Sequence, residues 1–509
     1  MHIEKKSTFS FIDLFAGIGG FRLALDHLGG HCIHFSEIDN EAIQTYCSNF
    51  NESPSLNLHD ITQIKQLPSV DLLTAGVPCQ SWSIAGKNLG FDDDRGQLWN
   101  DTLYLLHQSQ PKAFIFENVK GLADPRNHTA LDYILKRIQQ AGYFAKYFVI
   151  NSSDYGVPQD RVRVYIVGFK EKQYSDRFQL LKPYKNQLKL IDVLQEDVKY
   201  TIPYKQNQAS IALDLFGQPI ENKRRYRKTQ GMNDFFLFND IRNGPTTIHS
   251  WDLLPTTERQ KNICLLILKN RRKSTYGKLD GNPMSLAHLQ ALDHSITQQE
   301  LDSLVEIGIL KTLNYTYQVQ LKSQSALDAV ELLILNHAEH NLISLDNLKN
   351  SPTLKKIRSQ LDALLNGLVS KAILTPYEKR YEFKYTKIST GIEGVNRVFL
   401  PKSEAFPTLV ASDTNDFIAL QDIEADTEEE YKKLFLQEIF HKKQFRKISK
   451  QEACLIQGFP KDFILPETRS RWMKLIGNSV SVPVIQMLAQ AMLNTGFLEY
   501  EQNTKRCAA

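Results

Sequence analysis

The chain has 509 residues, of which 42% are hydrophobic, and its 61 Lys and Arg against 57 Asp and Glu give a formal net charge of +4. This length predicts two or three domains, and the small charge excess permits a polyanionic partner without requiring one. The six cysteines are scattered without a CxxC pair, which argues against a disulfide framework or a zinc site, and no metal is expected. No apolar run reaches the roughly 18 residues of a membrane helix, and no signal sequence is recognisable, so we expect a protein of the cytoplasm.

The first apolar run is followed by glycines and then by a helical pattern. Residues 11–15 read as a buried strand, residues 16–20 as a glycine turn, and residues 21–28 as a helix. This layout is typical of a nucleotide-binding crossover, in which glycines let the backbone approach the ligand closely. The spacing is GxGG rather than GxGxxG, which disfavours a dinucleotide.

The following runs continue the alternation of strands and helices. A second strand, 31–36, ends at Glu37, where a ribose hydroxyl would be held, while Asp39 fits the N-cap of the next helix. A third strand is expected to end near 59–61, and later strands are expected at 70–75, 113–116 and 162–168, with helices at 101–110 and 129–141. This order predicts an α/β fold with a doubly wound, mostly parallel sheet.

A lone cysteine follows the strand at 70–75. Cys79 lies where Gly76 and Pro78 end that strand, and ligands of such sheets collect at the carboxyl ends of strands. An isolated cysteine is more often a small buried hydrophobe. Here, however, the other strand ends carry Glu117 and an arginine pair, Arg161 and Arg163, and a carboxylate buried after four apolar residues is costly without a purpose. The polar stretch 80–99 that follows is expected to form a loop that closes over the site.

Six strings in order resemble the DNA (cytosine-5)-methyltransferases of bacterial restriction–modification systems. The resemblance covers about residues 9–195 and 396–496 and leaves the long middle unexplained. One string alone would be weak, but six in the family's order leave little room for chance. The strings are FIDLFAGIGG at 11–20, GVPCQS at 76–81, ENV at 117–119, QDRVR at 159–163, RKISKQEACLIQGFP at 446–460 and GNSV at 477–480.

The resemblance implies a mechanism that suits these residue types. Carbon 5 of cytosine is not nucleophilic, but a thiolate that adds to C6 turns the ring into an enamine whose C5 can attack a methyl group. Cys79 would supply the thiolate, Glu117 would protonate N3, and Arg161 and Arg163 would hold O2 and a phosphate. The target base must be flipped out of the duplex to be reached.

The resemblance also implies the methyl donor and the partners. The fold would be that of the class I methyltransferases that use S-adenosyl-L-methionine, and the substrate would be double-stranded DNA. A functionally paired restriction endonuclease, a monomeric state and association with the bacterial nucleoid are expected. Many relatives carry Trp where this chain has Ile38, which puts cofactor affinity in question. The implied cofactor-binding residues are Phe15, Gly17, Gly20, Glu37, Ile38, Asp60, Ile61, Pro78, Asn478 and Ser479.

The middle of the chain lies where this family keeps its target-recognition domain. We expect the catalytic domain at 1–195, the recognition domain at 196–469 and a C-terminal return at 470–509. A repeated pattern of leucines and tyrosines predicts two tandem winged-helix-like units, at about 260–322 and 328–387, which would either read DNA or serve as helical packing modules. The residues expected to contact DNA are Gln80, Ser83, Lys87 and Arg95 in and after the loop, Arg271 and Arg272 in a basic cluster, and Thr408 before the return.

Two other hypotheses remain at this point. RNA (tRNA) cytosine methyltransferases share the fold, although the long middle favours duplex DNA. A DNA-binding regulator that has lost catalysis is the other, although Cys79, Glu117, Arg161 and Arg163 are all present.

Overall fold

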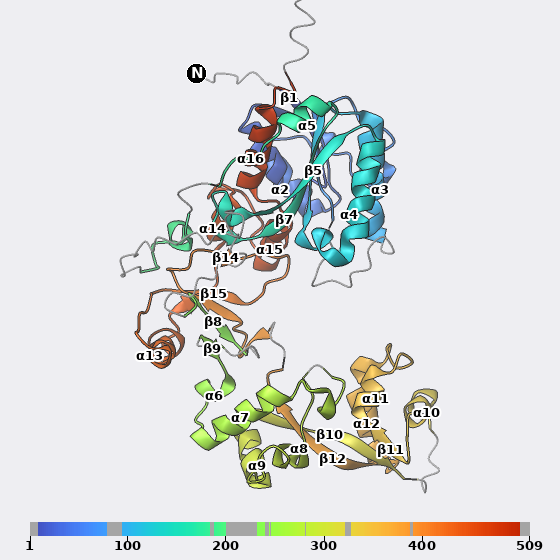
Figure 1. The fold of residues 1–509 in the computed structure, drawn as a ribbon, viewed down its shortest axis with the longest axis vertical. Coiled ribbons are helices and arrows are strands. Elements are labelled where there is room, and N and C mark those ends of the chain that lie inside the picture. Colours follow the sequence, from blue (N-terminus) through green and yellow to red (C-terminus); the bar gives the residue numbers. More distant parts are fainter. Residues whose placement is uncertain are drawn as a thin grey trace, which may run out of the picture. The chain divides into compact units, whose positions relative to one another are not determined.

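The computed structural model describes most of the chain and separates into two compact units (Figure 1). The two ends of the chain, residues 1–235 and 398–509, form unit 1, and the segment between them, residues 236–397, forms unit 2. The expected recognition domain began at 196 and ended at 469, whereas residues 398–469 are grouped here with the two chain ends. The described residues are 9–78, 94–183, 188–199, 232–239, 244, 246–279, 281–320, 327–386 and 390–498, without the side chains of 94–96.

A six-stranded sheet forms the centre of unit 1. Its strand order is β2-β1-β3-β4-β7-β5, in which β2, β1, β3 and β4 are parallel and β7 is antiparallel to both of its neighbours. The expectation of a mostly parallel sheet is therefore confirmed. The strands are β1 (Phe9–Leu14), β2 (Gly30–Ser36), β3 (Leu72–Gly76), β4 (Ala113–Val119), β5 (Phe144–Asn151) and β7 (Val162–Phe169).

Helices cover both faces of this sheet, because successive side chains of a strand point to opposite faces. Phe11 of β1 is buried in the layer with α1, α2 and α16, and its neighbour Ile12 is buried in the opposite layer with α3 and α4 (Figure 1). The helices of unit 1 are α1 (Gly20–Asp26), α2 (Asn40–Phe50), α3 (Asp94–Ser109), α4 (His128–Gln140), α5 (Lys172–Arg177), α13 (Glu428–Leu434), α14 (Lys450–Gln457), α15 (Arg469–Asn478) and α16 (Val482–Leu493).

Two local expectations are wrong. No strand ends near 59–61, because a 3-10 turn, η1 (Pro54–Leu56), leaves only a single bridge between Phe35 and Asn57 before Asp60 caps the next turn, η2 (Ile61–Gln63). The stretch expected to be a loop up to Trp99 becomes helical at Asp94. Trp99 is fully buried and packs edge-on against Phe116 of β4, with 6.1 Å between ring centroids. Burial of this large ring favours the helix over a loop.

The C-terminal segment returns to the sheet and completes unit 1. The last helix, α16, packs against α1, as expected from the sequence. Strand β14 (Phe406–Pro407) pairs in parallel with β6 (Gln159–Asp160), and β15 (Asp416–Ala419) pairs antiparallel with β16 (Phe445–Arg446). Helix α13 continues into a π-helical turn, η11 (Phe435–Phe440), and the shorter 3-10 turns are η4 (Lys120–Ala123), η5 (Pro125–Asn127), η6 (Ser152–Asp154) and η7 (Leu190–Val193).

One stretch is apolar enough to cross a membrane by length and composition alone. It is Arg469–Leu493, which contains α15 and α16, with a mean hydropathy of 1.2 in its most apolar window. That window is 78% buried inside the structure, which is the behaviour of a core helix.

Unit 2 is built from two halves that repeat the same order of elements. Each half has three helices followed by one long strand: α7, α8, α9 and β10 in the first half, and α10, α11, α12 and β12 in the second. The elements between 235 and 399 are β8 (Phe235–Phe238), β9 (Thr247–Ile248), α6 (Ser250–Leu253), α7 (Glu258–Asn270), η8 (Ser274–Tyr276), α8 (Leu286–Gln290), α9 (Gln298–Glu306), β10 (Leu310–Val319), α10 (Ala329–Leu335), β11 (Leu342–Ser344), α11 (Leu345–Asn350), η9 (Arg358–Gln360), α12 (Leu361–Ser370), β12 (Leu374–Phe383) and β13 (Arg397–Phe399).

The two halves exchange strands. The strand pair that we expected inside each half is formed between them, because β10 and β12 pair antiparallel along their whole length. Tyr381 of β12 is buried among the helices of the first half and bridges Met284 there. In the same way, Tyr317 of β10 is buried among the helices of the second half and pairs with Ile343 of β11. Each hydrophobic core is therefore completed by the other half, which local sequence patterns do not reveal.

Candidate active site

The glycine turn after β1 has a backbone that the sequence makes possible. Phe15 and Gly17 have positive φ values of 54° and 55°, and Gly19, at φ 87°, precedes α1. A Cβ on Gly20 would lie 2.7 Å from the Val480 side chain and 2.8 Å from the Ser479 hydroxyl, so only glycine lets the C-terminal segment lie against α1. A Cβ on Gly17 would instead meet no described atom within 4 Å. The turn therefore has one face packed and another that is open.

The carboxylate of Glu37 is fixed beside this open face. Its Oε2 accepts a hydrogen bond from Gly17 N at 2.9 Å, and its Oε1 accepts from Ile38 N at 2.7 Å and Asp39 N at 2.8 Å. Asp39 caps α2 through Glu41 N and Ala42 N, as its position in the sequence suggested. The carboxylate at the end of β2 is thus held by backbone donors in one orientation.

The surroundings of Glu37 fit the expected cofactor. Ile38 is 71% exposed, which leaves a large apolar side chain uncovered directly beside the fixed carboxylate. Asp60 uses one oxygen to cap η2, through Thr62 N at 2.9 Å, while Ile61 is buried below it. An apolar surface, an oriented carboxylate and an open glycine turn are what a purine nucleoside with an amino-acid tail would need.

Two of the expected cofactor residues lie at the end of α15, and they differ in exposure. Asn478 is exposed, whereas Ser479 is buried against Gly20, and its carbonyl oxygen accepts hydrogen bonds from Arg161 and Gln457. Pro78, at the end of β3, is half-buried. Asn478 therefore presents its side chain to solvent, while Ser479 serves the packing of the chain ends.

Glu117 lies at the end of β4, deep in the sheet. It pairs in register with Gly76 of β3, two residues before Pro78, and its Oε1 lies 3.2 Å from Arg163 Nε. Burial raises the pKa of Glu117, and the nearby guanidinium groups of Arg163 and Arg161 offset part of that rise. The structure thus places a carboxyl group that tends to keep its proton next to the segment that leads to Cys79. Cys79 itself, with residues 80–93, lies outside the described residues.

Arg161 does not share the surroundings of Arg163. Its guanidinium is 2% exposed and donates to three backbone carbonyl oxygens, those of Leu409 at 3.0 Å, Gly477 at 3.2 Å and Ser479 at 2.7 Å. These carbonyls are 248, 316 and 318 residues away along the chain. The expectation that Arg161 holds a base or a phosphate is therefore at odds with its contacts, which join the two chain ends.

Sequence reasoning overlooked three polar residues that organise the site. Asn118 donates to Val77 O at 3.2 Å and so ties the segment before Cys79 to β4. Gln159 is fully buried and bonds to Ile456 O and to the Gln457 side chain at 3.0 and 2.8 Å. Burial raises the pKa of Asp13 to about 7, and the hydrogen bond from Thr74 at 2.9 Å offsets part of the rise. Each of these three residues is a polar residue inside or next to an apolar run, and this pattern in the sequence could have identified them.

The residues expected to contact DNA differ in whether the structure describes them and in how exposed they are. Gln80, Ser83 and Lys87 lie outside the described residues, and the side chain of Arg95, in α3, is not described. Arg271 is only 7% exposed and its guanidinium lies 5.5 Å from the ring of Phe383, so it is a packing residue rather than a surface cation. Arg272 is exposed.

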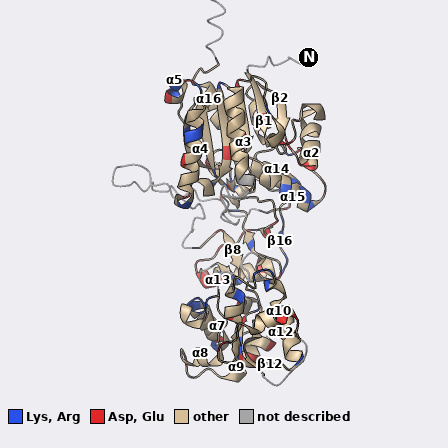
Figure 2. Ribbon diagram, turned by 90° about the vertical axis from the view of Figure 1, so that its right-hand side faces the viewer, with Lys and Arg blue, Asp and Glu red and all other residues tan. Residues whose placement is uncertain are grey.

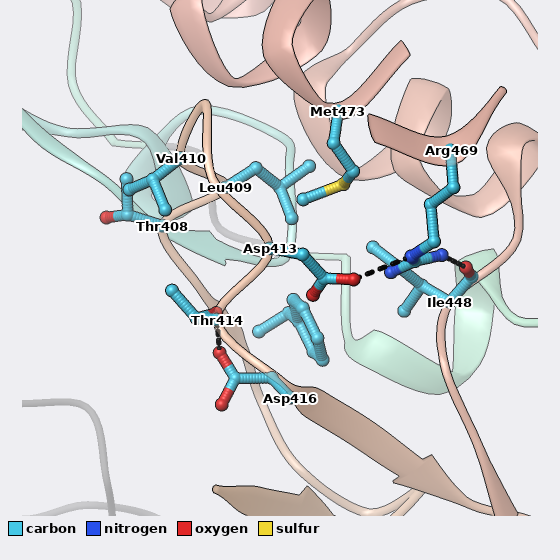
Figure 3. Close-up of a pocket in the computed structure, with 10 residues that line it drawn as sticks. Thr408, Leu409, Val410, Asp413, Thr414, Asp416, Ile448, Arg469 and Met473 are labelled. Atoms are coloured by element: carbon cyan, nitrogen blue, oxygen red, sulfur yellow. Dashed lines mark hydrogen bonds and ion pairs between the residues drawn. The ribbon is translucent and has the colours of Figure 1, made fainter. Parts of the chain in front are cut away.

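Thr408 lines a pocket of unit 1 that has both polar and apolar lining residues (Figure 3). Its hydroxyl donates to Asp160 O at 2.6 Å. Asp413 in the same pocket is half-buried, and hydrogen bonds from Arg469 Nε at 2.8 Å and Lys447 Nζ at 2.7 Å outweigh its burial and lower its pKa. These ion pairs hold the segment that follows Thr408. The pocket is lined by Phe406, Thr408, Leu409, Val410, Asp413, Thr414, Asp416, Ile448, Arg469 and Met473.

Comparisons with known proteins cover the whole chain, including the middle. Type II methyltransferase M.HgiBI of Herpetosiphon aurantiacus is 41% identical over 497 residues, which cover 97% of this chain and 98% of that protein. Type II methyltransferase M.BanI of Aneurinibacillus aneurinilyticus is 28% identical over 512 residues, with 96% of each protein covered. Among solved structures, the methyltransferase EhMeth of Entamoeba histolytica aligns with 95% of this chain at 13% identity and a TM-score of 0.46, which adds no argument.

The family model of the C-5 cytosine-specific DNA methylases matches residues 9–494. That range begins at β1 and ends just after α16, so it contains every helix and strand of unit 1 and the whole of unit 2. The glycine turn, the fixed carboxylate of Glu37 and the buried pair of Glu117 and Arg163 are the expected parts of such an enzyme. The chain belongs to the C-5 cytosine-specific DNA methylase family.

Proposed function

We propose that this enzyme transfers a methyl group from S-adenosyl-L-methionine to C5 of a flipped-out cytosine in a specific sequence of double-stranded DNA. The observation that carries the proposal is the position of Glu117, which is buried, paired with Arg163 and in register with the strand that leads to Cys79. Because relatives at about 40% identity are Type II methyltransferases, we infer that the methylation protects DNA in the cytoplasm from a paired restriction endonuclease.

The cysteines that the structure describes support Cys79 as the nucleophile. Burial raises the pKa of the Cys32, Cys264 and Cys454 thiols to about 12, and burial also raises the pKa of Cys47. A thiol with a pKa of about 12 is almost never ionised at neutral pH, so Cys32, Cys264 and Cys454 are poor nucleophiles. Cys79 follows the end of a central strand, where the pocket for a reacting base is expected.

In the proposed reaction the Cys79 sulfur forms a bond to C6 of the cytosine. The electron pair of the C5–C6 double bond moves into the ring, and N3 accepts the proton that Glu117 holds, so that the ring becomes a neutral enamine. When bound, S-adenosyl-L-methionine would supply an electrophilic methyl group to C5, and its sulfonium would leave as a neutral thioether. Loss of the C5 proton to water and return of the N3 proton to the Glu117 carboxylate then let the C6–S bond break, which returns the thiolate and restores the aromatic ring.

Arg163 and Arg161 have separate roles in this proposal. Arg163, whose side chain is 13% exposed and lies 3.2 Å from Glu117, remains available to hold O2 of the base and orients the carboxyl group. Arg161 is a positioning residue, because its donors are engaged with the carbonyl oxygens of the C-terminal return.

The residues that would hold S-adenosyl-L-methionine surround the open face of the glycine turn. Glu37 would take the ribose hydroxyl groups, Ile38 and Phe15 would contact the adenine, and Asp60 would accept from its amino group. Backbone groups at Gly17 would meet the methionine part, because none of the residues that the structure describes occupies the space beside it. The remaining contacts would come from Gly20, Ile61, Pro78, Asn478 and Ser479.

Trapping with 5-fluorocytosine tests the proposal. Fluorine at C5 cannot leave as a proton, so wild-type enzyme with S-adenosyl-L-methionine should form a stable adduct with duplex DNA that contains this base. Cys79→Ala should form none, and a Cys454→Ala variant is the matched control that keeps the nucleophile. The same assay on tRNA separates the RNA methyltransferase alternative, since an adduct on tRNA alone would overturn the DNA assignment. Absence of any adduct on both substrates would refute the mechanism.

A further inference from the structure

We propose that the second half of unit 2 binds DNA phosphates through the segment that joins α11 to α12, residues 351–360. This inference rests on the proposed function and assigns part of the DNA contact to one half of the repeat. Lys355, Lys356 and Arg358 lie in this segment and are exposed, and Lys349 precedes it in α11. In the part of the chain that the structure describes, none of these four cations forms an ion pair with a carboxylate. They are the kind of side chains that neutralise phosphates and release counterions.

The repeat supplies an internal comparison. The stretch from α8 to α9 in the first half, residues 286–306, contains four carboxylates and no lysine or arginine. The corresponding stretch from α11 to α12, residues 345–370, contains four lysines and arginines against two carboxylates. Two halves of the same architecture thus carry opposite charge at equivalent places. The local fold therefore does not require the cations, and a function in one half explains them.

The contacts in the first half strengthen this contrast. Arg259 of α7 lies 2.8 Å from Asp293 and 2.9 Å from Glu300, so the cation that faces this stretch is already paired. Glu306 of α9 adds a further negative charge, whereas Asp302 lies 3.7 Å from Lys379 and is paired with it. This stretch therefore offers phosphates no lysine or arginine of its own. The basic cluster that the sequence analysis assigned to DNA also lies in the first half, and its Arg271 is buried.

The carboxylates near the cationic segment do not neutralise it. Asp346 of α11 accepts hydrogen bonds from Lys278 N at 3.1 and 3.2 Å and from the Asn350 side chain at 3.0 Å, so it is occupied within unit 2. Asp362 lies in the first turn of α12, and it is the one opposing charge on the segment's C-terminal side. Figure 2 shows both signs of charge distributed over the elements of each unit. The DNA contact is therefore inferred from a local excess of cations rather than from a large basic face.

The test is the salt dependence of DNA binding by the full chain. Lys355→Ala, Lys356→Ala and Arg358→Ala are combined, and the affinity for a duplex substrate is measured over a range of NaCl concentrations. Each phosphate contact contributes about 0.9 to the slope of log K against log salt, so the slope should fall by about 2 to 3. The matched control removes three paired cations, Lys172, Lys261 and Lys442, whose partners are Asp176, Glu258 and Glu438, and should leave the slope unchanged.

Two measurements, the salt slope and the 5-fluorocytosine adduct, distinguish failure of this inference from failure of the proposed function. The triple variant should fold normally, since its side chains are exposed, and at saturating protein it should still form the 5-fluorocytosine adduct. A slope equal to that of the wild type, with the adduct intact, overturns the phosphate contact alone. If the wild type forms no adduct, the proposed function fails regardless of the slope.

Discussion

Replacing Arg161 with alanine should destabilise unit 1 rather than remove a contact with DNA. The guanidinium donates three hydrogen bonds to the carbonyl oxygens of Leu409, Gly477 and Ser479. A hydrogen bond from a charged donor contributes about 1.5–3 kcal/mol, and a buried carbonyl left without a donor costs about 1–3 kcal/mol. Because the three bonds share one side chain and do not add fully, we expect the free energy of unfolding to fall by about 4 kcal/mol.

Urea unfolding followed by tryptophan fluorescence measures this loss, since Trp99 and Trp472 are buried in unit 1. Arg161→Lys should recover about half of the lost stability, because an ammonium group keeps the charge but cannot reach all three carbonyls with the geometry of a guanidinium. The control is Arg126→Ala, which removes an exposed arginine paired with Asp124 and should not change the unfolding midpoint measurably.

A direct role of Arg161 in DNA binding would leave the stability unchanged and reduce activity. If Arg161→Ala unfolds at the same urea concentration as the wild type and yet loses methyl transfer, the side chain acts on the substrate as the sequence first suggested. The positioning role derived from its three carbonyl contacts would then be refuted.

Three further predictions concern the cofactor, the reacting base and unit 2. Ile38→Trp should tighten binding of S-adenosyl-L-methionine about fivefold, because aromatic stacking contributes about 1 kcal/mol, and calorimetry that shows no change would remove Ile38 from the adenine site. In the proposed mechanism Glu117 holds the proton that it gives to N3, so kcat/KM should fall as the pH rises through its raised pKa. Arg163→Met removes a charge that lowers this pKa and should move the fall to higher pH, and an unshifted profile would contradict the pairing. Tyr381→Ala in β12 should increase hydrogen exchange in α7 and α9 of the first half, and an effect confined to the second half would contradict the strand exchange.

Local sequence patterns predicted much of the structure of the catalytic part of the chain. The apolar runs predicted β1, β2, β3, β4 and β7, and the central strands β1, β3 and β4 are apolar because they are buried on both faces almost throughout. The glycines at 17–20 predicted the turn before α1, since positive φ values are required there. The positions of Glu37 and Glu117 followed from the ends of their strands. The six strings identified the family, which the family model confirms.

Predictions from the sequence were less accurate for residues whose role depends on partners that are distant along the chain. Arg161 and Arg163 are equivalent in the string QDRVR, yet one is tied to carbonyls more than 240 residues away and the other faces Glu117. Arg271 looked like a surface cation, but the fold buries it beside Phe383. Spacing along the chain does not report which donors are already satisfied.

The sequence by itself therefore determined five strands of the central sheet, the repeat and the chemistry that the side chains can perform. Tertiary structure alone decided that α3 begins at Asp94, that β10 and β12 pair across the repeat, and which of the two arginines lies beside Glu117. The physical reason is the range of the interactions. Hydrophobic periodicity and turn chemistry act over a few residues, whereas hydrogen-bond satisfaction, strand pairing and burial are settled between segments that meet only when the chain has folded.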